Sequence, residues 1–350
     1  MSRETPRPAS VRPGRSAYSM DFSFVIPVYN RPGEVDELLA SLCRQAAGGF
    51  EAVVVEDGSS LTCKDVVDKY AGRIPVSYHY KENSGPGPSR NYGVERAKGR
   101  YAIILDSDVV LPDGYIDEVK AELSRKKADA FGGPDREHSS FTPVQKAISY
   151  SMTSFLTTGG IRGGKRKLDK FYPRSFNMGV ERTAYARLGG FRDMRFGEDI
   201  DFSIRIFKAG LECRLFPGAW VWHKRRTDFR KFFKQVHNSG IARINLGRLH
   251  PGSLKAVHAL PAVFTAGSAL LAALAAATLS PWPLVPLAAY ALVVFAHAAL
   301  SCRSVRIAAL SVVAAFVQLW GYGSGFIAAW WKMRVMGKAG YSAFEKTFYD

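Results

Sequence analysis

The strongest constraint on the fold is a series of short, almost fully apolar runs that stop at turns or on acidic residues. The runs are Phe22–Val28, Phe50–Val55 and Tyr101–Leu105, and a further strand is expected near Pro75–Tyr80. Runs of this length without polar alternation are typical of parallel strands buried on both faces. Helical patterns separate them: Pro32–Leu42, Lys64–Tyr70 and, after a Gly/Pro turn over Asn83–Ser89, Arg90–Ala97. This alternation predicts a doubly wound, mostly parallel α/β sheet with right-handed crossovers.

The middle of the chain is less regular and predicts a mixture of helices, loops and short strands. We expect a helix over Phe141–Thr158, a mobile basic loop over Gly159–Lys170, a helix over Glu198–Lys208, and strands over Leu211–Phe216 and Ala219–His223. Glycine is the residue that most often follows the end of a helix, so Gly210 is expected to end the last of these helices.

From Val257 to Trp331 almost every residue is apolar or small. Three stretches are about long enough to cross a bilayer as helices: Val257–Leu279, Leu284–Leu300 and Ile307–Trp331, the third with a GYGSG interruption over Gly321–Gly325. A bilayer core needs about 20 apolar helical residues. These stretches predict two or three membrane helices. A buried, soluble helical bundle is the alternative.

Basic residues near these stretches predict which side of the membrane their ends occupy. Arg248 and Lys255 precede the first stretch and Arg303 and Arg306 follow the second, which places both sites in the cytosol. The basic residues after the third stretch, from Lys332 onward, also favour the cytosol, in conflict with a simple odd span. A re-entrant or interfacial third segment would resolve the conflict, as would a charge bias that is overruled. The sequence leaves both open.

Composition narrows the class of protein. In the 350-residue chain, 47% hydrophobic against 23% charged residues exclude a disordered chain. The net charge of +17 suits either nucleic acid or anionic membranes and phosphorylated substrates. Because the excess lies near the predicted pocket and the apolar tail, we expect no nucleic-acid partner. Four cysteines without metal-site spacing predict reduced thiols, and no secretory signal is recognisable.

Acidic and polar residues stand where predicted strands end or a predicted helix begins. They are Asp57, Asp106, Asp108, Glu198, Asp199 and His223. Ligands of open α/β sheets bind at the carboxyl ends of the strands. A D-x-D step there can hold a divalent cation against a diphosphate, and a later carboxylate can act as a base. Helix capping, for the carboxylates, and simple packing, for the histidine, are the structural alternatives.

Four motifs in order resemble the family 2 glycosyltransferases of the GT-A fold. They are FSFVIPVYNRPGEVDELLASL, VVVEDGSS, NSGPGPSRNYGVERAKGRYAIILDSDVVLP and NMGVERTAYARLGGF followed by FGEDIDFSIRIFKAG. The resemblance covers about Asp21 to His223, and the joint match is highly specific. The segment Phe232–Arg243 loosely resembles the Q-x-x-R-W segment of processive members, but it lacks the RW element. That departure puts polymerising activity in doubt.

The resemblance implies a role for each matching residue. It implies a nucleotide wall at Pro27, Tyr29 and Asn30, recognition of the base by Asp57, and an arginine near the donor at Arg90. In the D-x-D step, Asp106 would contact the ribose and the metal shell, with Ser107 beside it, and Asp108 would ligate Mg²⁺ or Mn²⁺. His223 would be a third metal ligand, Asp199 the general base, and Glu198 its support. Lys224–Arg226 would touch the diphosphate, and the basic loop Arg162–Lys170 would close over the donor or steer a lipid phosphate.

These observations predict five segments: a disordered basic arm (1–20), a GT-A domain (21–245), a juxtamembrane linker (246–256), membrane helices (257–331) and a basic tail (332–350). The expected protein is a metal-dependent, inverting glycosyltransferase of the inner membrane with its catalytic domain in the cytosol. It would move a sugar from a nucleotide-diphosphate sugar to a hydroxyl of a lipid-linked glycan or envelope precursor. Two alternatives stay open: transfer to polyprenyl phosphate itself, and a catalytically silent nucleotide-sugar-binding subunit.

Overall fold

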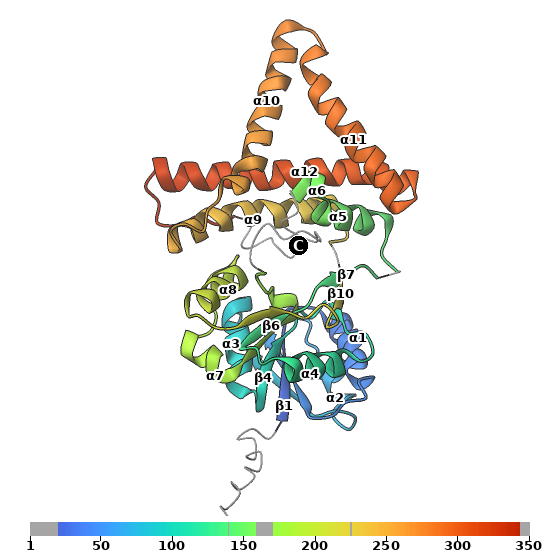
Figure 1. Cartoon of the computed structure of the whole chain (residues 1–350), viewed down its shortest axis with the longest axis vertical. Helices are drawn as coiled ribbons and strands as arrows, with labels where there is room; N and C mark the ends of the chain where they lie inside the picture. Colours follow the sequence, from blue (N-terminus) through green and yellow to red (C-terminus); the bar gives the residue numbers. More distant parts are fainter. Residues whose placement is uncertain (1–19, 139, 159–170, 225, 344–350) are drawn as a thin grey trace, which may run out of the picture.

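A computed structural model describes residues 20–138, 140–158, 171–224 and 226–343. It has an α/β part and, on one side of it, a part built from long helices (Figure 1). The expected basic arm and the expected basic loop over Gly159–Lys170 lie outside the described residues, the arm except for Met20.

The main sheet has seven strands in the order β3-β2-β1-β4-β8-β6-β9. Their bounds are β1 Met20–Val28, β2 Phe50–Asp57, β3 Val76–Lys81, β4 Gly99–Ile104, β6 Ala130–Gly132, β8 Met178–Glu181 and β9 Cys213–Leu215. The strands β1 to β4 pair in parallel, whereas β8 runs antiparallel to both of its neighbours. The prediction of a mostly parallel α/β sheet is confirmed.

A second, three-stranded sheet forms beside the carboxyl end of β4. Its order is β5-β10-β7, with β5 Val109–Val110, β7 Asp135–Arg136 and β10 Val221–His223. Antiparallel pairing sets His223 opposite Val109, and the N–H of Lys224 donates to the carbonyl of Asp108 at 3.1 Å. Backbone pairing therefore brings His223 to the D-x-D step across more than a hundred residues of chain.

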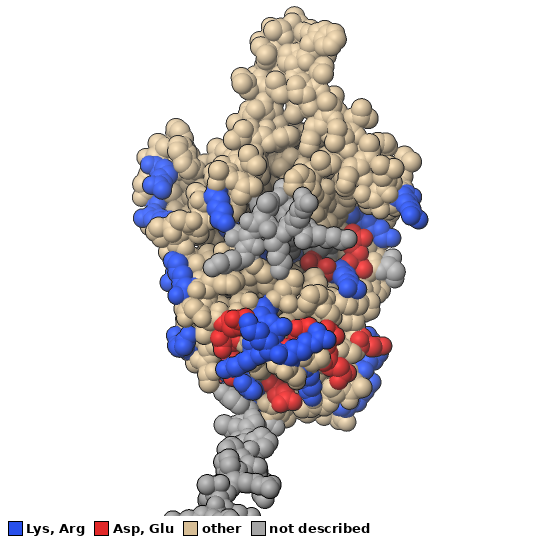
Figure 2. Space-filling view, in the orientation of Figure 1, with Lys and Arg blue, Asp and Glu red and all other residues tan. Residues whose placement is uncertain are grey.

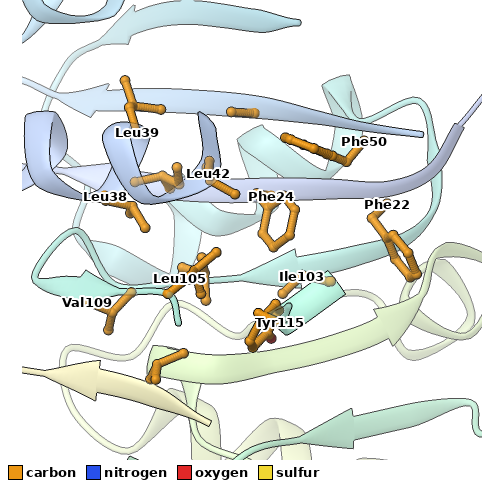
Figure 3. Packing of buried hydrophobic residues seen from close by; sticks show 14 of the residues in the cluster. Phe22, Phe24, Leu38, Leu39, Leu42, Phe50, Ile103, Leu105, Val109 and Tyr115 are labelled. Atoms are coloured by element: carbon orange, nitrogen blue, oxygen red, sulfur yellow. The ribbon is translucent and has the colours of Figure 1, made fainter. Parts of the chain in front are cut away.

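Helices cover both faces of the main sheet. They are α1 Pro32–Cys43, α2 Lys64–Asp68, α3 Pro86–Arg96, α4 Tyr115–Arg125, α7 Arg182–Leu188 and α8 Glu198–Lys208. Two further helices, α5 Pro143–Thr153 and α6 Phe155–Thr158, lie in the helical part instead (Figure 1). Phe24, Leu38 and Tyr115 pack together on one face (Figure 3), and Val25 packs with Phe202 on the other. Both faces of β1 are thus buried, as its continuous apolar run predicted.

Two helix predictions were wrong at their boundaries. The helix expected from Arg90 begins at Pro86, inside the predicted turn. Proline is tolerated in the first turn of a helix because the N–H groups there have no intrahelical acceptor. The helix expected over Phe141–Thr158 is divided at Ser154, whose backbone is extended, into α5 and α6.

The C-terminal part consists of four long helices. They are α9 Phe229–Leu249, α10 Leu260–Thr278, α11 Val285–Cys302 and α12 Val305–Trp330, which a turn of π-helix over Trp331–Val335 extends. Sequence reasoning did not predict α9. By length and composition, the helices containing α10, α11 and α12 could each cross a membrane, and only 11% of the most apolar window is buried in each of the first two. This exposure indicates membrane association and argues against a buried soluble bundle.

The helices α9 and α12 lie side by side across the open base of a hairpin formed by α10 and α11 (Figure 1). The expected interruption over Gly321–Gly325 was wrong, because α12 runs through it without a break. Its glycines instead allow close approach: a Cβ on Gly325 would lie 2.0 Å from the carbonyl oxygen of His237 in α9. Likewise, a Cβ on Gly240 of α9 would lie 2.1 Å from the carbonyl oxygen of Tyr322.

We predict that Gly240→Ala lowers the stability of the helical part by about 1–3 kcal/mol, because the added methyl group forces the two backbones apart. The melting temperature of the detergent-purified protein should fall by several degrees. Gly267→Ala in α10 is the matched control, since no atom lies within 4 Å of the added Cβ. Equal melting temperatures for the two variants would contradict the close packing of α9 against α12.

Candidate active site

A cavity of about 750 Å³ lies between the carboxyl ends of the strands and the long helices. Most of the residues singled out in the sequence line it: Pro27, Tyr29, Asp57, Arg90, Asp106, Ser107, Asp108, Glu198, Asp199 and His223. Asn30 is not among the lining residues. It has a positive φ of 54°, and its side-chain oxygen accepts hydrogen bonds from the N–H of Leu61 and the hydroxyl of Ser60. The structure therefore gives Asn30 a turn-forming contact.

Asp57, at the end of β2, is buried and holds the chain that leads into α3. Its Oδ1 accepts from the N–H of Ser84 at 2.9 Å and from Nζ of Lys81 at 2.6 Å, and its Oδ2 accepts from the N–H of Gly85 at 2.9 Å. A carboxylate offers about four acceptor positions, so three donors leave room for another. Asp57 thus fixes the loop before α3 and still lines the cavity.

The D-x-D step and His223 form the group of described residues best suited to a metal ion. Ligand atoms of Asp106, Asp108 and His223 all lie within 4.8 Å of one another. Nε2 of His223 lies 3.2 Å from Oδ1 of Asp108, and its ring stacks on Phe176 at 4.8 Å between centroids. Two carboxylates and an imidazole are a donor set that suits Mn²⁺.

One further observation fits a cation at this site. In the described part of the chain, Nδ1 of His223 is a buried atom with no hydrogen-bond partner. Burial alone would raise the pKa of Asp108, but His223 and Arg31 lower it well below its usual value. Arg31 lies 3.1 Å from Asp108, so a positive charge already stands beside this carboxylate.

Arg90, on α3, joins the end of β4 to the start of α8. Its guanidinium donates to Asp106 at 2.9 Å and to Glu198 at 2.6 Å, and the residue is only 4% exposed. Burial and the charge of Asp199 raise the pKa of Glu198, although the ion pair with Arg90 opposes that rise. The arginine therefore fixes the relative positions of the D-x-D step and the Glu-Asp pair.

Asp199 is the second residue of α8, at the helix end that stabilises negative charge. Gly197, whose φ of 85° suits glycine, turns the chain into the helix. Nε of Arg174 donates to Oδ2 of Asp199 at 2.6 Å. Burial would raise the pKa of Asp199, but Arg174 and Arg90 outweigh it and lower the pKa. The carboxylate is thus ionised and held by an arginine.

A model of the family Glycosyl transferase family 2 matches residues 23–189. The chain carries a glycosyl transferase family 2 domain. A validoxylamine A glucosyltransferase of Streptomyces hygroscopicus subsp. jinggangensis is 36% identical over 113 residues, which are 31% of this chain and 27% of that protein. A poly(ribitol-phosphate) β-N-acetylglucosaminyltransferase, TarS of Staphylococcus aureus, is 32% identical over 114 residues, 31% of this chain and 20% of that protein. The aligned region is thus a small part of these relatives.

The GT-A fold of the family 2 domain has a solved counterpart. The mannosyltransferase PcManGT from Pyrobaculum calidifontis, in complex with GDP-Man and Mn²⁺, superposes with a TM-score of 0.61 at 19% identity. The superposition covers 87% of this chain and 88% of that one. At 19% sequence identity, this similarity shows a shared fold alone.

The cavity extends to the long apolar C-terminal helices. Its far wall includes Phe264 of α10, Tyr290 of α11 and Leu319 of α12. Arg243 of α9 also lines it. One cavity therefore has charged walls at the strand ends and apolar walls at the base of the hairpin.

Sequence reasoning missed two arginines of the family 2 domain and misplaced one lysine. Arg31 could have been found, because it follows β1 where other lining residues stand, but nothing local marks Arg174. Lys224, expected near a diphosphate, instead pairs with Glu37 at 2.8 Å and is not among the cavity-lining residues. Of its neighbours, Arg226 lines the cavity and Arg225 lies outside the described residues.

We predict that Arg90→Ala destabilises the family 2 domain by about 3–5 kcal/mol, because it leaves the buried carboxylate of Glu198 without its partner. Chemical unfolding of the purified protein measures this loss. Arg96→Ala, at the end of the same helix, is the control and should cost about 1 kcal/mol or less. Adding Glu198→Gln to Arg90→Ala should restore part of the stability, and additive effects in this double-mutant cycle would contradict the coupling.

Proposed function

We propose that the protein moves a sugar from a nucleoside diphosphate sugar to a hydroxyl of a lipid-linked acceptor at the membrane surface. The observation that carries this proposal is the single cavity between the strand-end carboxylates and the bases of α10 and α11. A soluble donor can occupy the charged end while the lipid of the acceptor stays at the apolar end. Sharing one cavity brings the two substrates together without a search through solution.

The donor would bind at the charged end. Pro27 and Tyr29 would form the wall of the nucleotide site, and Asp57 would use its remaining acceptor position for the base. Asp106, Asp108 and His223 would hold Mg²⁺ or Mn²⁺. A divalent cation there would supply charge stabilisation to the departing diphosphate. Arg31 and Arg226 line the same end of the cavity and suit phosphate oxygens.

Asp199 would act as the general base. The acceptor oxygen attacks the anomeric carbon from the side opposite the diphosphate, its proton passes to Asp199, and the nucleoside diphosphate leaves with the bonding electrons. This single displacement inverts the configuration at the anomeric carbon. Glu198, fixed by Arg90 at 2.6 Å, would position the acceptor or the helix end. The ion pair with Arg174 keeps Asp199 ionised, and the same pair weakens it as a base.

The relatives support a role in envelope glycan synthesis. Their names include a glucosyltransferase and a poly(ribitol-phosphate) β-N-acetylglucosaminyltransferase, and a minor teichoic acid biosynthesis protein of Bacillus subtilis is 32% identical over 109 residues. Basic residues flank the apolar helices on the side of the α/β part, which supports a cytosolic catalytic domain on an inner membrane. The proposed segments remain a GT-A domain over 21–245, a linker over 246–256 and membrane helices over 257–331.

A polyprenyl phosphate acceptor is the second candidate, and the Arg174–Asp199 ion pair favours it. A phosphate is already ionised near neutral pH, so it needs positive charge around it and no base. Arg174, Arg195 and Arg243 all line the cavity and offer that charge. The two candidates differ in what they demand of Asp199.

We predict that Asp108→Ala abolishes metal-dependent binding of the donor. Thermal stabilisation by nucleotide sugars, with and without Mn²⁺, measures this binding, because a ligand of the folded state raises its stability. Asp113→Ala, on an exposed carboxylate five residues later, is the control and should bind as the parent does. Retained Mn²⁺ dependence in Asp108→Ala would count against the metal site.

For a hydroxyl acceptor, we predict that Asp199→Asn lowers turnover by about 10²–10⁴-fold, the range in which general bases contribute. Donor binding should be unchanged. Transfer to a membrane extract with a labelled nucleotide sugar measures turnover, and Asp193→Asn on the exposed loop before α8 is the control. Unchanged turnover in Asp199→Asn would remove the base assignment and favour the phosphate acceptor.

A further inference from the structure

The helix α12 is apolar enough to span a membrane. Its contacts with the neighbouring helices, however, indicate a different orientation. It packs along its length against α9, and the two helices run together across the base of the α10–α11 hairpin (Figure 1). The backbones meet at Gly240, Gly321 and Gly325, where added Cβ atoms would clash with the facing helix. Any membrane position of α12 therefore applies to α9 as well.

The helix α9 is too polar to lie in the core of a bilayer. It carries five basic residues and no acidic ones: Arg230, Lys231, Lys234, Arg243 and Arg248. It also begins only six residues after His223, which belongs to the candidate metal site. Moving it across the membrane would bury basic side chains in hydrocarbon, which is costly. The pair formed by α9 and α12 cannot stand upright in the bilayer without that cost.

Both ends of α12 contact helices that lie on the same side of it as the α/β part. Near its start, Ala308 packs in one cluster with Tyr150 of α5. At its middle, Gln318 accepts from the hydroxyl of Ser151 in α5 at 3.3 Å. Beyond its end, the carbonyl of Tyr341 accepts from Asn245 of α9 at 2.8 Å. Arg248 of α9 donates to the carbonyls of residues 338 and 339 at 3.0 Å each. A spanning helix would place these two ends on opposite faces of the membrane.

One side of α12 nevertheless exposes a row of large apolar residues. Val313, Trp320 and Ile327 are 45%, 40% and 40% exposed, and Trp331 continues the row. Residues seven apart in a helix lie on the same side, so these side chains form a single stripe. The opposite side packs on α9 and α5 through small residues such as Ala314 and Gly325. This asymmetry is typical of a helix that lies in a membrane surface.

We propose that α12 lies in the plane of the membrane, in the leaflet that faces the α/β part, and that the α10–α11 hairpin alone crosses the bilayer. The stripe formed by Val313, Trp320, Ile327 and Trp331 contacts the acyl chains, while α9 lies on the aqueous side of α12. This inference concerns the placement of the chain and does not depend on the transfer reaction.

Charge supports this placement. Both helices of the hairpin lack Asp, Glu, Lys and Arg, and the hairpin shows no charged residues in Figure 2. Blue side chains stand instead at the two ends of α12 in that view. Arg303 and Arg306 lie at one end and Lys332 and Arg334 at the other. Lysine and arginine at one depth suit the anionic headgroups of one leaflet.

The placement also accounts for the charge conflict in the sequence. With two spans, the basic residues before α10, after α11 and after α12 all occupy the same side of the membrane. It further gives α12 a role at the cavity, because Gln318, Leu319 and Tyr322 line it. The helix α12 then covers the membrane side of the candidate active site at the depth of the lipid headgroups. A lipid-linked acceptor carries its polar part at this depth.

Depth measurements on the full-length protein test the proposal. Single nitroxide labels at Val313→Cys, Trp320→Cys and Ile327→Cys, with the four native cysteines replaced by serine, are reconstituted in phosphatidylethanolamine and phosphatidylglycerol vesicles. Relative accessibility to oxygen and to a polar nickel reagent reports depth. An in-plane helix gives one shallow depth at all three positions. A spanning helix changes depth by about 10 Å every seven residues, since each residue rises 1.5 Å.

The hairpin supplies the matched control. Val263→Cys and Leu270→Cys on α10, at residues 66% and 69% exposed, should differ in depth by about 10 Å. Graded depths along α12 like those of this control would overturn the proposal. Aqueous accessibility at all three α12 positions would overturn it as well, because the stripe would then not contact lipid.

The side of the membrane on which each segment lies provides an independent test, which needs no label on α12. In sealed vesicles, a membrane-impermeant maleimide should reach Gly340→Cys from the same side as Asp113→Cys on the α/β part. Leu279→Cys at the tip of the hairpin, where the native residue is 94% exposed, should react only from the other side. Labelling of Gly340→Cys together with Leu279→Cys would show that α12 crosses the membrane and would reject the proposal.

Discussion

The buried ion pairs of Arg90 are the interaction on which the candidate site depends. One guanidinium holds the end of β4, through Asp106, and the start of α8, through Glu198. Glu198 and Asp199 are both buried, and without a positive charge beside them one of the two carboxylates would have to be neutralised or moved away. The pair formed by Arg174 and Asp199 extends the same network. The positions of the D-x-D step and of the Glu-Asp pair therefore depend on arginines as much as on the sheet.

The second constraint is the contact between α9 and α12, where glycines let two helix backbones touch. It couples the α/β part to the apolar C-terminal helices, since α9 follows the strand that carries His223. The cavity lies at this junction and has both charged and apolar walls. Folding the chain thus creates, in one place, a surface for a diphosphate and a surface for a lipid. Neither part of the chain has both surfaces by itself.

The strands of the parallel sheet could be predicted closely, because runs such as Phe22–Val28 are apolar on both faces and have few other stable environments. Helix boundaries near proline and glycine residues were harder to predict. The start of α3 at Pro86 lay inside an apparent turn, and α12 continues through a glycine-rich segment that reads as a break. Pro86 is tolerated because it stands in the first turn of α3, where its missing N–H costs no hydrogen bond. The glycines of α12 are retained in the helix because they pack closely against α9. The turn role of Asn30 and the pairing of Lys224 with Glu37 also depend on neighbours distant in the chain.

By itself, the sequence determined the α/β class, the apolar C-terminal helices and the candidate carboxylates. Hydrophobic patterning and short motifs are local properties, and local properties can be read along the chain. Only the tertiary structure decided that Arg31 and Arg174 face those carboxylates, that antiparallel pairing brings His223 to Asp108, and that α9 accompanies α12. These features depend on contacts between segments far apart in the sequence. Such contacts are fixed by how helices and strands pack, and no single segment encodes them.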